Sequence, residues 1–446
     1  MSVRSAKPFA TVPRWRDLLA VLQPRWQHGH TLTLLEGGRA YFPALLAAIR
    51  AAQTSIYLET YIFAQDETAQ AIHAALCDAA RRGVRVRLVV DGFGTPAFPA
   101  KWQTAFAESG VEYHVFRPEH PTWRIRNPLS RPLSRQRLRR MHRKLALFDE
   151  QIAFVGGINL VDDWRADNGQ PLAAPRLDFA VHVVGPLVGQ LRMLAIRQWW
   201  QLDWFQRDMG ERPHWRDFPA YWQEWRAARQ VSTANRGDTK TFLSLPETTQ
   251  HALAALALRD NLRHRRTIED AYLMAFAEAR QEVILANAYF FPGRNFRLAL
   301  CALARRGVRV RLLLQGQSEH PIQYYGSQVL YRDFLRAGVE IYEYQPSFLH
   351  AKVAVVDPGL SSTWATVGSS NIDPYSLLLA REANVLVRDP VFSNALLAAL
   401  DRALAHSYPI TLRDLQRFTW WRRLLSWLGY GLLRLGVGLI GQHREY

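Results

Sequence analysis

Short apolar runs alternate with longer amphipathic segments along the chain, and the same order of segments occurs twice. Residues 145–148 and 353–356 have the length and composition of buried strands, and residues 152–155 and 366–367 suit the strand that follows each of them. Each second strand ends at a glycine, which is typical of a turn. Because predicted strands alternate with predicted helices, each half should be an α/β unit with a largely buried sheet.

A longer repeat lies upstream of these runs. Residues 74–88 match residues 298–312, and each copy predicts a helix that ends at a glycine after two arginines and leads into a strand. Earlier strands are predicted at 55–63 and 282–290. The duplication predicts two tandem α/β sandwich repeats with pseudo-twofold symmetry and a site at their interface. The expected domains are an N-terminal tail (1–30), a first repeat (31–226), a linker (227–239), a second repeat (240–409) and a C-terminal segment (410–446).

Each repeat carries the same polar residue types in the same order: a His, a Lys two residues later, an Asp, and an Asn after a glycine turn. These are His142, Lys144, Asp149 and Asn159 in the first repeat and His350, Lys352, Asp357 and Asn371 in the second. Side chains two apart on a strand share a face, so each His and Lys should point the same way. Only five of the 56 basic residues are Lys, and two of these five occupy this position, which makes a chance match a poor explanation.

The paired sets suit a phosphodiester, whose anionic oxygens need fixed donors and whose leaving group needs a proton. Two lysines, two Asn amides and the Ser369 or Ser370 hydroxyl could hold the charge. A neutral imidazole can attack phosphorus while an opposite imidazolium protonates the leaving oxygen, a step worth about a hundredfold to ten-thousandfold. This chemistry requires no metal, and the residues alone do not decide which histidine attacks.

Both sets resemble the HxK(x)4D(x)6GSxN signature of the phospholipase D superfamily. The first differs by Gly157 where the family often has Ser, and the second by an inserted loop at 358–362. Within the superfamily the chain resembles bacterial cardiolipin synthases, particularly the B type that lacks two amino-terminal membrane helices. The stretches that carry this resemblance are Tyr41 to Ile49, Ile56 to Phe63, Met141 to Asn159 and Asn287 to Pro292. The resemblance implies the phospholipase D-like fold and a phosphohistidine mechanism without a cofactor.

The resemblance also implies residue roles. The catalytic set would be His142, Lys144, Asp149, His350, Lys352 and Asp357, and the phosphate-binding set would be Asn159, Asn371 and Ser369. His142 would be the nucleophile and His350 the general acid that later becomes the base, because the family usually assigns the attack to the first repeat. A carboxylate after each motif would contact the histidine of the opposite half, so that Asp178 orients His350 and Glu382 orients His142. Asp149 and Asp357 are expected to hold strand and loop together rather than transfer protons.

A formal charge of +17 calls for an anionic partner, and both nucleic acid and anionic lipid satisfy it. Eight arginines and no acid lie between Arg124 and Arg143, which indicates either a solvated loop or a segment that gathers phosphate or contacts a membrane. The C-terminus favours lipid: residues 424–442 are largely apolar, with one charge, Arg434, and several glycines, and they follow an Arg- and Trp-rich stretch. This pattern predicts a helix or hairpin in the membrane interface, and a helix packed on the catalytic body is the alternative.

The two cysteines, Cys77 and Cys301, occupy equivalent positions in the repeats, which favours reduced core residues and a reducing compartment. Residues 1–11 lack the apolar core of a signal peptide. The expected location is therefore peripheral, on the cytoplasmic side of the inner membrane.

The function implied by the resemblance is synthesis of cardiolipin from phosphatidylglycerol and a second phospholipid or alcohol acceptor, at an anionic phospholipid membrane. A phospholipase D-type hydrolase or transphosphatidylase of other phospholipids is the first alternative. A nuclease of the same superfamily is supported by the charge but not by the C-terminal segment, and a catalytically silent membrane-binding protein is disfavoured by the intact motifs. The acceptor remains open, because its selection depends on pocket shape and water exclusion.

Overall fold

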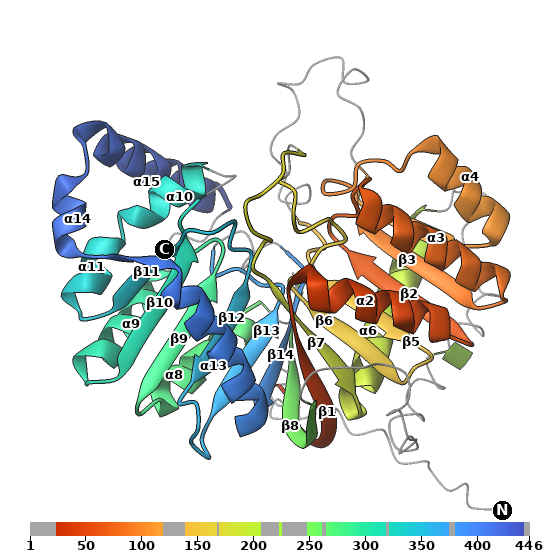
Figure 1. Cartoon of the computed structure of the whole chain (residues 1–446), viewed down its shortest axis with the longest axis horizontal. Helices are drawn as coiled ribbons and strands as arrows, with labels where there is room; N and C mark the ends of the chain where they lie inside the picture. The colour runs from red at the N-terminus through yellow and green to blue at the C-terminus, as the bar shows by residue number, and fades with distance from the viewer. Residues whose placement is uncertain are drawn as a thin grey trace, which may run out of the picture.

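The computed structural model describes residues 24–118, 139–166, 169–206, 223–224, 248–260, 265–317, 321–373 and 380–440. Within these residues the strands form one 15-stranded sheet with helices packed on its faces (Figure 1). The first-half strands are β1 (Gln27–Glu36), β2 (Ser55–Thr60), β3 (Arg85–Asp91), β4 (Glu112–Phe116), β5 (Lys144–Phe148), β6 (Ile152–Gly156) and β7 (Phe179–Val184). The second-half strands are β8 (Thr248–Arg259), β9 (Glu282–Asn287), β10 (Arg309–Gln315), β11 (Glu340–Tyr344), β12 (Lys352–Val356), β13 (Trp364–Gly368), β14 (Glu382–Arg388) and β15 (Ser407–Ile410).

The strand order is the same when read outward from the centre of the sheet in either direction. It runs β1-β7-β6-β5-β2-β3-β4 on one side and β8-β14-β13-β12-β9-β10-β11 on the other, with β15 added at the second edge. Strands β1 and β8 pair antiparallel at the centre. This symmetry confirms the predicted pair of α/β repeats. The first strand begins at Gln27, ahead of the predicted start of the repeat, and the predicted linker at 227–239 lies outside the described residues.

The helices also repeat. Those of the first half are α2 (Gly37–Ala51), α3 (Glu67–Arg81), α4 (Ala100–Ser109) and α6 (Pro186–Gln206). Those of the second half are α8 (Thr267–Glu278), α9 (Arg294–Arg305), α10 (Pro321–Gln328), α11 (Tyr331–Arg336), α13 (Pro390–Ala405), α14 (Leu412–Arg417) and α15 (Trp420–Ile440). The duplicated helices α3 and α9 each end before a glycine with φ near +90°, Gly83 and Gly307, a conformation that a side chain would disfavour. Cys77 and Cys301 are buried on these two helices as free thiols.

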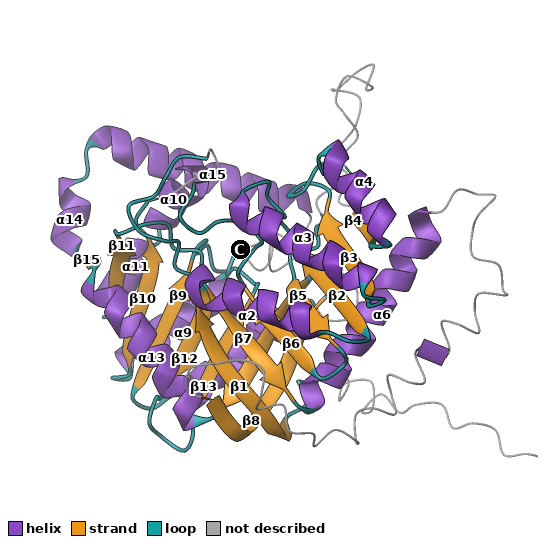
Figure 2. Cartoon of the chain, turned by 45° about the vertical axis from the view of Figure 1, so that its right-hand side comes forward, coloured by secondary structure: helices purple, strands orange, loops and turns teal. Residues whose placement is uncertain are grey.

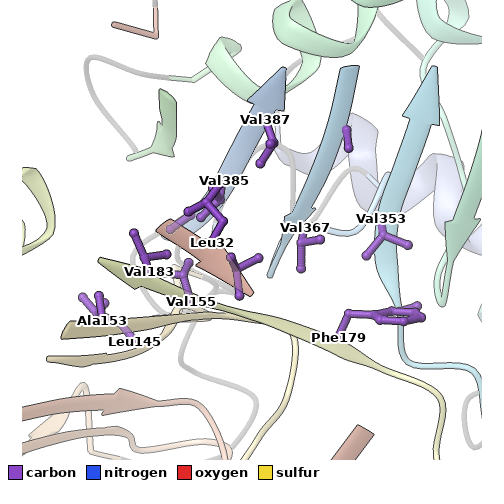
Figure 3. Close-up of a cluster of buried hydrophobic side chains, with 14 of the residues drawn as sticks. Leu32, Leu145, Ala153, Val155, Phe179, Val183, Val353, Val367, Val385 and Val387 are labelled. Atoms are coloured by element: carbon purple, nitrogen blue, oxygen red, sulfur yellow. The ribbon is translucent and has the colours of Figure 1, made fainter. Parts of the chain in front are cut away.

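A central apolar cluster joins the two halves. In Figure 3, Val155 and Phe179 of the first half lie across this cluster from Val353, Val367 and Val385 of the second half. Helices α6 and α13 pack onto the same cluster. Interiors packed in this way deform little, so the cluster fixes the position of one half against the other.

The C-terminal helix α15 packs on α10 at the edge of the second half (Figure 2). The two helices approach closely at Gly326 and Gly429, where a Cβ on Gly326 would lie 3.1 Å from the Gly429 carbonyl carbon. Leu433 is buried in this contact, but most large apolar side chains of the helix between residues 420 and 435 are exposed. They are Trp420, Trp421, Leu424, Leu425, Trp427, Leu428, Leu432 and Leu435. No helix among the described residues is both long enough and apolar enough to cross a bilayer.

Candidate active site

His142 is brought to the opposite half by a backbone bridge. Met141 pairs with Arg381, and the backbone N–H of His142 donates to the Arg381 carbonyl at 3.0 Å. Glu382 follows Arg381, and its Oε1 lies 3.0 Å from Nδ1 of His142. The same Nδ1 lies 3.1 Å from the carbonyl oxygen of Ser369. A carbonyl only accepts, so Nδ1 carries the hydrogen and Nε2 keeps the lone pair that could attack phosphorus.

His350 is held by the symmetry-related bridge. Leu349 pairs with Leu177, and the backbone N–H of His350 donates to the Leu177 carbonyl at 2.8 Å. Asp178 follows Leu177, and its Oδ2 lies 2.6 Å from Nδ1 of His350. Burial alone would raise the pKa of Asp178, but Lys352 and His350 together lower it, so the group is an ionised acceptor. Each histidine therefore contacts the carboxylate that the resemblance to the phospholipase D superfamily assigns to it.

The two lysines of the motifs are buried beside the histidines. Lys144 donates to the carbonyl oxygen of His142 at 2.8 Å. Lys352 donates to the carbonyl of His350, and its Nζ lies 3.0 Å from Nδ1 of that ring. Burial lowers the pKa of Lys144 to about 7 and also lowers the pKa of Lys352. An anion bound between these ammonium groups would favour their charged forms.

The pKa values of both histidines are lowered, and the causes connect the two halves. Burial is the largest cause for each, and it lowers the pKa of His350 to about 3 with the help of Lys352. The charge of Lys352 also lowers the pKa of His142, and that of Lys144 lowers the pKa of His350. Both rings are therefore neutral at neutral pH. Together with the contacts of Glu382 and Asp178 across the halves, these effects place the two motifs in one candidate site.

Asp149 and Asp357 lie at the far ends of their strands, bound to backbone. Asp149 accepts from the backbone N–H groups of residues 53–55 at 2.8–2.9 Å. Asp357 accepts from those of residues 280–282 at 2.7–3.0 Å. Both have a positive φ, 48° and 47°, at the turn after the strand. These contacts hold each turn against the neighbouring strand.

The predicted phosphate ligands lie at the ends of β6 and β13. Asn159 accepts from the backbone N–H of Ile62 at 3.3 Å, and Asn371 is buried. The hydroxyl of Ser369 donates to Glu382, so this side chain supports the carboxylate beside His142. In the first half Gly157 takes this position, and a Cβ there would lie 2.3 Å from Oδ1 of Asp178. Within the described residues, no group of three or more His, Cys, Asp or Glu side chains could hold a metal.

A second pair of equivalent residues, which the motifs did not predict, lies at the ends of β3 and β10. Asp91 accepts from the backbone N–H of Met141 at 2.8 Å, and Gln315 accepts from that of Leu349 at 2.6 Å. Burial raises the pKa of Asp91 to about 6. Extending the match of 74–88 with 298–312 by three residues aligns these two positions and could have identified them.

Glu59 of β2 is buried behind the site and paired with Arg143 at 2.8 Å. On the other side of the motif, the ring of Tyr61 lies edge-on to His142, with 4.9 Å between ring centroids. Of the Arg-rich segment before His142, residues 119–138 lie outside the described residues.

Comparisons with known proteins give a consistent result. A family model described as "Cardiolipin synthase, PLD-like domain" matches residues 45–167 and 272–404. Cardiolipin synthase B of Escherichia coli K12 is 36% identical over 417 residues, covering 93% of this chain and 91% of that protein. Cardiolipin synthase A of Pseudomonas putida is 28% identical, covering 86% of this chain and 70% of its own length.

Two solved structures resemble the fold at 15% sequence identity. Phosphatidylserine synthase of Haemophilus influenzae has a TM-score of 0.61 and covers 97% of this chain and 100% of its own. Polyphosphate kinase of Porphyromonas gingivalis has a TM-score of 0.52 and covers 85% of this chain and 48% of its own. At this identity the likeness concerns the fold alone.

Proposed function

We propose that this chain, which belongs to the cardiolipin synthase family of phospholipase D-like proteins, makes cardiolipin from phosphatidylglycerol and a second phospholipid or alcohol acceptor. The enzymes of this family are phosphatidyltransferases. The observation that carries the proposal is the pair of histidines at the interface of the halves. Each lies beside a buried lysine and contacts a carboxylate of the opposite half.

In the first proposed step, Nε2 of His142 attacks the phosphorus of the donor lipid. The bond from phosphorus to the glycerol headgroup breaks, and the leaving oxygen takes a proton from His350. For this, His350 must first become an imidazolium. The bound phosphate anion would raise its pKa above the low value set by burial and Lys352, in the same direction as Asp178, which already favours the imidazolium. Lys144 and Lys352 supply positive charge to the phosphoryl oxygens.

In the second proposed step, a hydroxyl of the acceptor replaces the glycerol. His350, now neutral, takes the proton of that hydroxyl while its oxygen attacks phosphorus. The bond between phosphorus and His142 breaks and restores the free enzyme. With a second phosphatidylglycerol as acceptor the products are cardiolipin and free glycerol, whereas water would give phosphatidic acid.

The proposed place of action is an anionic membrane surface, and α15 is the proposed contact. Its outer face carries exposed tryptophans and leucines, with Arg423 and Arg434 also exposed on the helix. Such a face suits the boundary between headgroups and acyl chains, and its arginines suit anionic lipid. Helix α10, on which α15 packs, starts six residues after Gln315, the residue that holds the segment before His350. This nearness would keep the site close to the lipid. The free buried cysteines support the cytoplasmic side.

The proposed reaction is tested by mass spectrometry of lipids after incubation with vesicles of defined composition. Vesicles of phosphatidylglycerol should yield cardiolipin and glycerol in equal amounts, and His142→Ala should yield neither. Phosphatidic acid as the main lipid product would instead support a hydrolase. Cleavage of single- or double-stranded DNA or RNA, with no lipid turnover, would support a nuclease.

The membrane contact is tested separately by cosedimentation with vesicles. Trp427→Ser with Leu428→Ser should weaken binding to phosphatidylglycerol vesicles at least about tenfold, because two exposed apolar side chains lose their contact with acyl chains. Turnover of a short-chain, monomeric phosphatidylglycerol should be unchanged. Met274→Ser, at an exposed apolar residue of α8, is the control. Unaltered vesicle binding in the double variant would refute the role of α15.

A further inference from the structure

A buried polar network lies behind His142. Arg143 lies between His142 and Lys144, so its side chain points to the face of the sheet opposite to theirs. It donates from Nε to Oε2 of Glu59 at 2.8 Å and from Nη2 to Oε1 at 3.0 Å. Tyr57 donates its hydroxyl to the same carboxylate at 2.6 Å. Arg143 and Glu59 are almost fully buried, and a pair so placed must be fully hydrogen-bonded to be tolerated.

Gln198 of α6 extends this network to the other half. Its Oε1 accepts from Nη2 of Arg143 at 3.2 Å and also from Nη1 of Arg381. Arg381 is the residue whose carbonyl accepts the backbone N–H of His142, and it directly precedes Glu382. One buried amide oxygen therefore joins the residue after His142 to the residue before the carboxylate that contacts it. Burial, then Arg143, lowers the pKa of Arg381 to about 10, so it remains a cation at neutral pH.

The second half has no counterpart of these charges. The positions equivalent to Arg143, Glu59 and Arg381 are Ala351, Ala286 and Leu177, by the register of β12 with β9 and by the paired bridges. All three of these residues lie in the central apolar cluster. The contact of His350 with Asp178 is thus supported by packing, and that of His142 with Glu382 by packing and directed hydrogen bonds.

We propose that Glu59, Arg143, Gln198 and Arg381 are positioning residues that hold the His142–Glu382 pair in the geometry for attack on phosphorus. The inference rests on the proposed function, in which His142 is the nucleophile. Directed bonds matter more for an attacking atom than for a proton donor, because displacement by about 1 Å can cost on the order of a hundredfold in rate. A shift of either partner is transmitted to the other through Gln198.

The test uses Gln198→Leu, which breaks the link between the two arginines and leaves the Arg143–Glu59 pair intact. The substrate is bis(p-nitrophenyl) phosphate, whose leaving group departs without a proton, so the burst of p-nitrophenolate reports the attack by His142. We expect the burst rate to fall about tenfold with little change in the half-saturating concentration. Glu382 raises the pKa of His142, so a loosened pair should move the acid limb of the burst rate to lower pH.

Two further variants separate positioning from stability. Gln198→Glu keeps an acceptor oxygen between the arginines and should retain the burst rate and the wild-type acid limb. Gln190→Leu makes the same change on the same helix, where the amide donates to Gln27 away from the site, and should leave both unchanged. Thermal unfolding of each variant measures stability independently.

The inference is overturned if Gln198→Leu keeps the wild-type burst rate and acid limb, or if its loss of rate is matched by Gln190→Leu. It is also overturned if only the melting temperature falls. A wild-type enzyme that gives the burst but no cardiolipin would refute the proposed product and leave this test valid.

Discussion

Behind His142 the middle residue of the motif is Arg143, held in an ion pair, whereas behind His350 it is Ala351, packed in the apolar cluster. The residue that supports the preceding backbone is the acid Asp91 in the first half and the neutral Gln315 in the second. The backbone geometry is the same in both places. The charges around the two histidines have therefore diverged while the positions of the histidines have not.

The residues that shape the turns differ much less between the halves. Asp149 and Asp357 make equivalent contacts at nearly the same positive φ, although the second turn carries an inserted loop. Gly156 and Gly368 both end the second strand of their motif, and a Cβ at either would lie less than 3 Å from a neighbouring strand. The fold thus constrains these positions equally in both copies. The difference in charge around the two histidines is what the proposed division of roles between them predicts.

The largest expected effect separates those tasks directly. His142→Ala and His350→Ala should each lower cardiolipin synthesis on the order of a thousandfold or more. With bis(p-nitrophenyl) phosphate, His350→Ala should still release about one equivalent of p-nitrophenolate and then stop, because attack survives and the base for the second step is missing. His142→Ala should give no burst. If His142→Ala gives a burst and His350→Ala does not, and the phosphate is recovered on a peptide containing His350, the two roles are exchanged.

The two carboxylates should differ in the next largest effect. Asp178→Asn should lower kcat about a hundredfold, because His350 loses the charge that favours its imidazolium. Glu382→Gln should cost only about tenfold, since the Ser369 carbonyl still accepts from Nδ1 of His142 and keeps its tautomer. Steady-state kinetics with phosphatidylglycerol measure both losses. Equal losses would mean that the carboxylates serve their histidines in the same way.

Much of this comparison could be predicted from the sequence, because strands and turns are local and the repeat provides a second copy of each. The runs at 145–148 and 353–356 formed strands as expected, and the duplicated helices ended at Gly83 and Gly307. The order of the motifs and the resemblance together also indicated which carboxylate would lie near each histidine.

The buried network could not be predicted in this way. Its members come from β2, the start of β5, α6 and the start of β14, and they occur in one repeat only, so neither periodicity nor duplication points to them. The face of α15 that packs on the protein could not be predicted from the sequence either. Its amphipathic pattern indicated an interface helix, but which side meets the protein depends on the approach of Gly429 to Gly326 on a distant helix.

A smaller effect should follow from exchanging charge at the support positions. Asp91 raises the pKa of Lys144, so Asp91→Asn should lower that pKa further below its ordinary value and reduce the cationic fraction. We expect kcat/KM to fall a few-fold at pH 7.5 and to be unchanged near pH 5, where Asp91 itself carries a proton. Gln315→Glu adds a charge at the equivalent position and should not lower kcat/KM at pH 7.5. If Asp91→Asn instead lowers kcat/KM by the same factor at pH 7.5 and near pH 5, Asp91 acts only as a hydrogen-bond acceptor.

The smallest effect on activity should come from Asp149→Asn and Asp357→Asn, although the motif includes both residues. Asn tolerates positive φ and keeps one acceptor oxygen, so the turn should form, but a backbone N–H loses its partner. At the fully buried Asp357 this costs about 1–3 kcal/mol, so the melting temperature of Asp357→Asn should fall more than that of Asp149→Asn.

The stability that Asp149 contributes should depend on pH. Burial alone would raise the pKa of Asp149, but hydrogen bonds from residues 53–55 lower it overall, so its contribution to stability is present above its ordinary pKa and is lost at lower pH. The difference between wild type and Asp149→Asn should accordingly shrink in acid. Because neither carboxylate contacts a histidine, kcat per folded enzyme should stay within about twofold of wild type in both variants. A tenfold or larger loss of kcat, in a variant with an unchanged burst pH profile and melting temperature, would place that Asp in the chemistry.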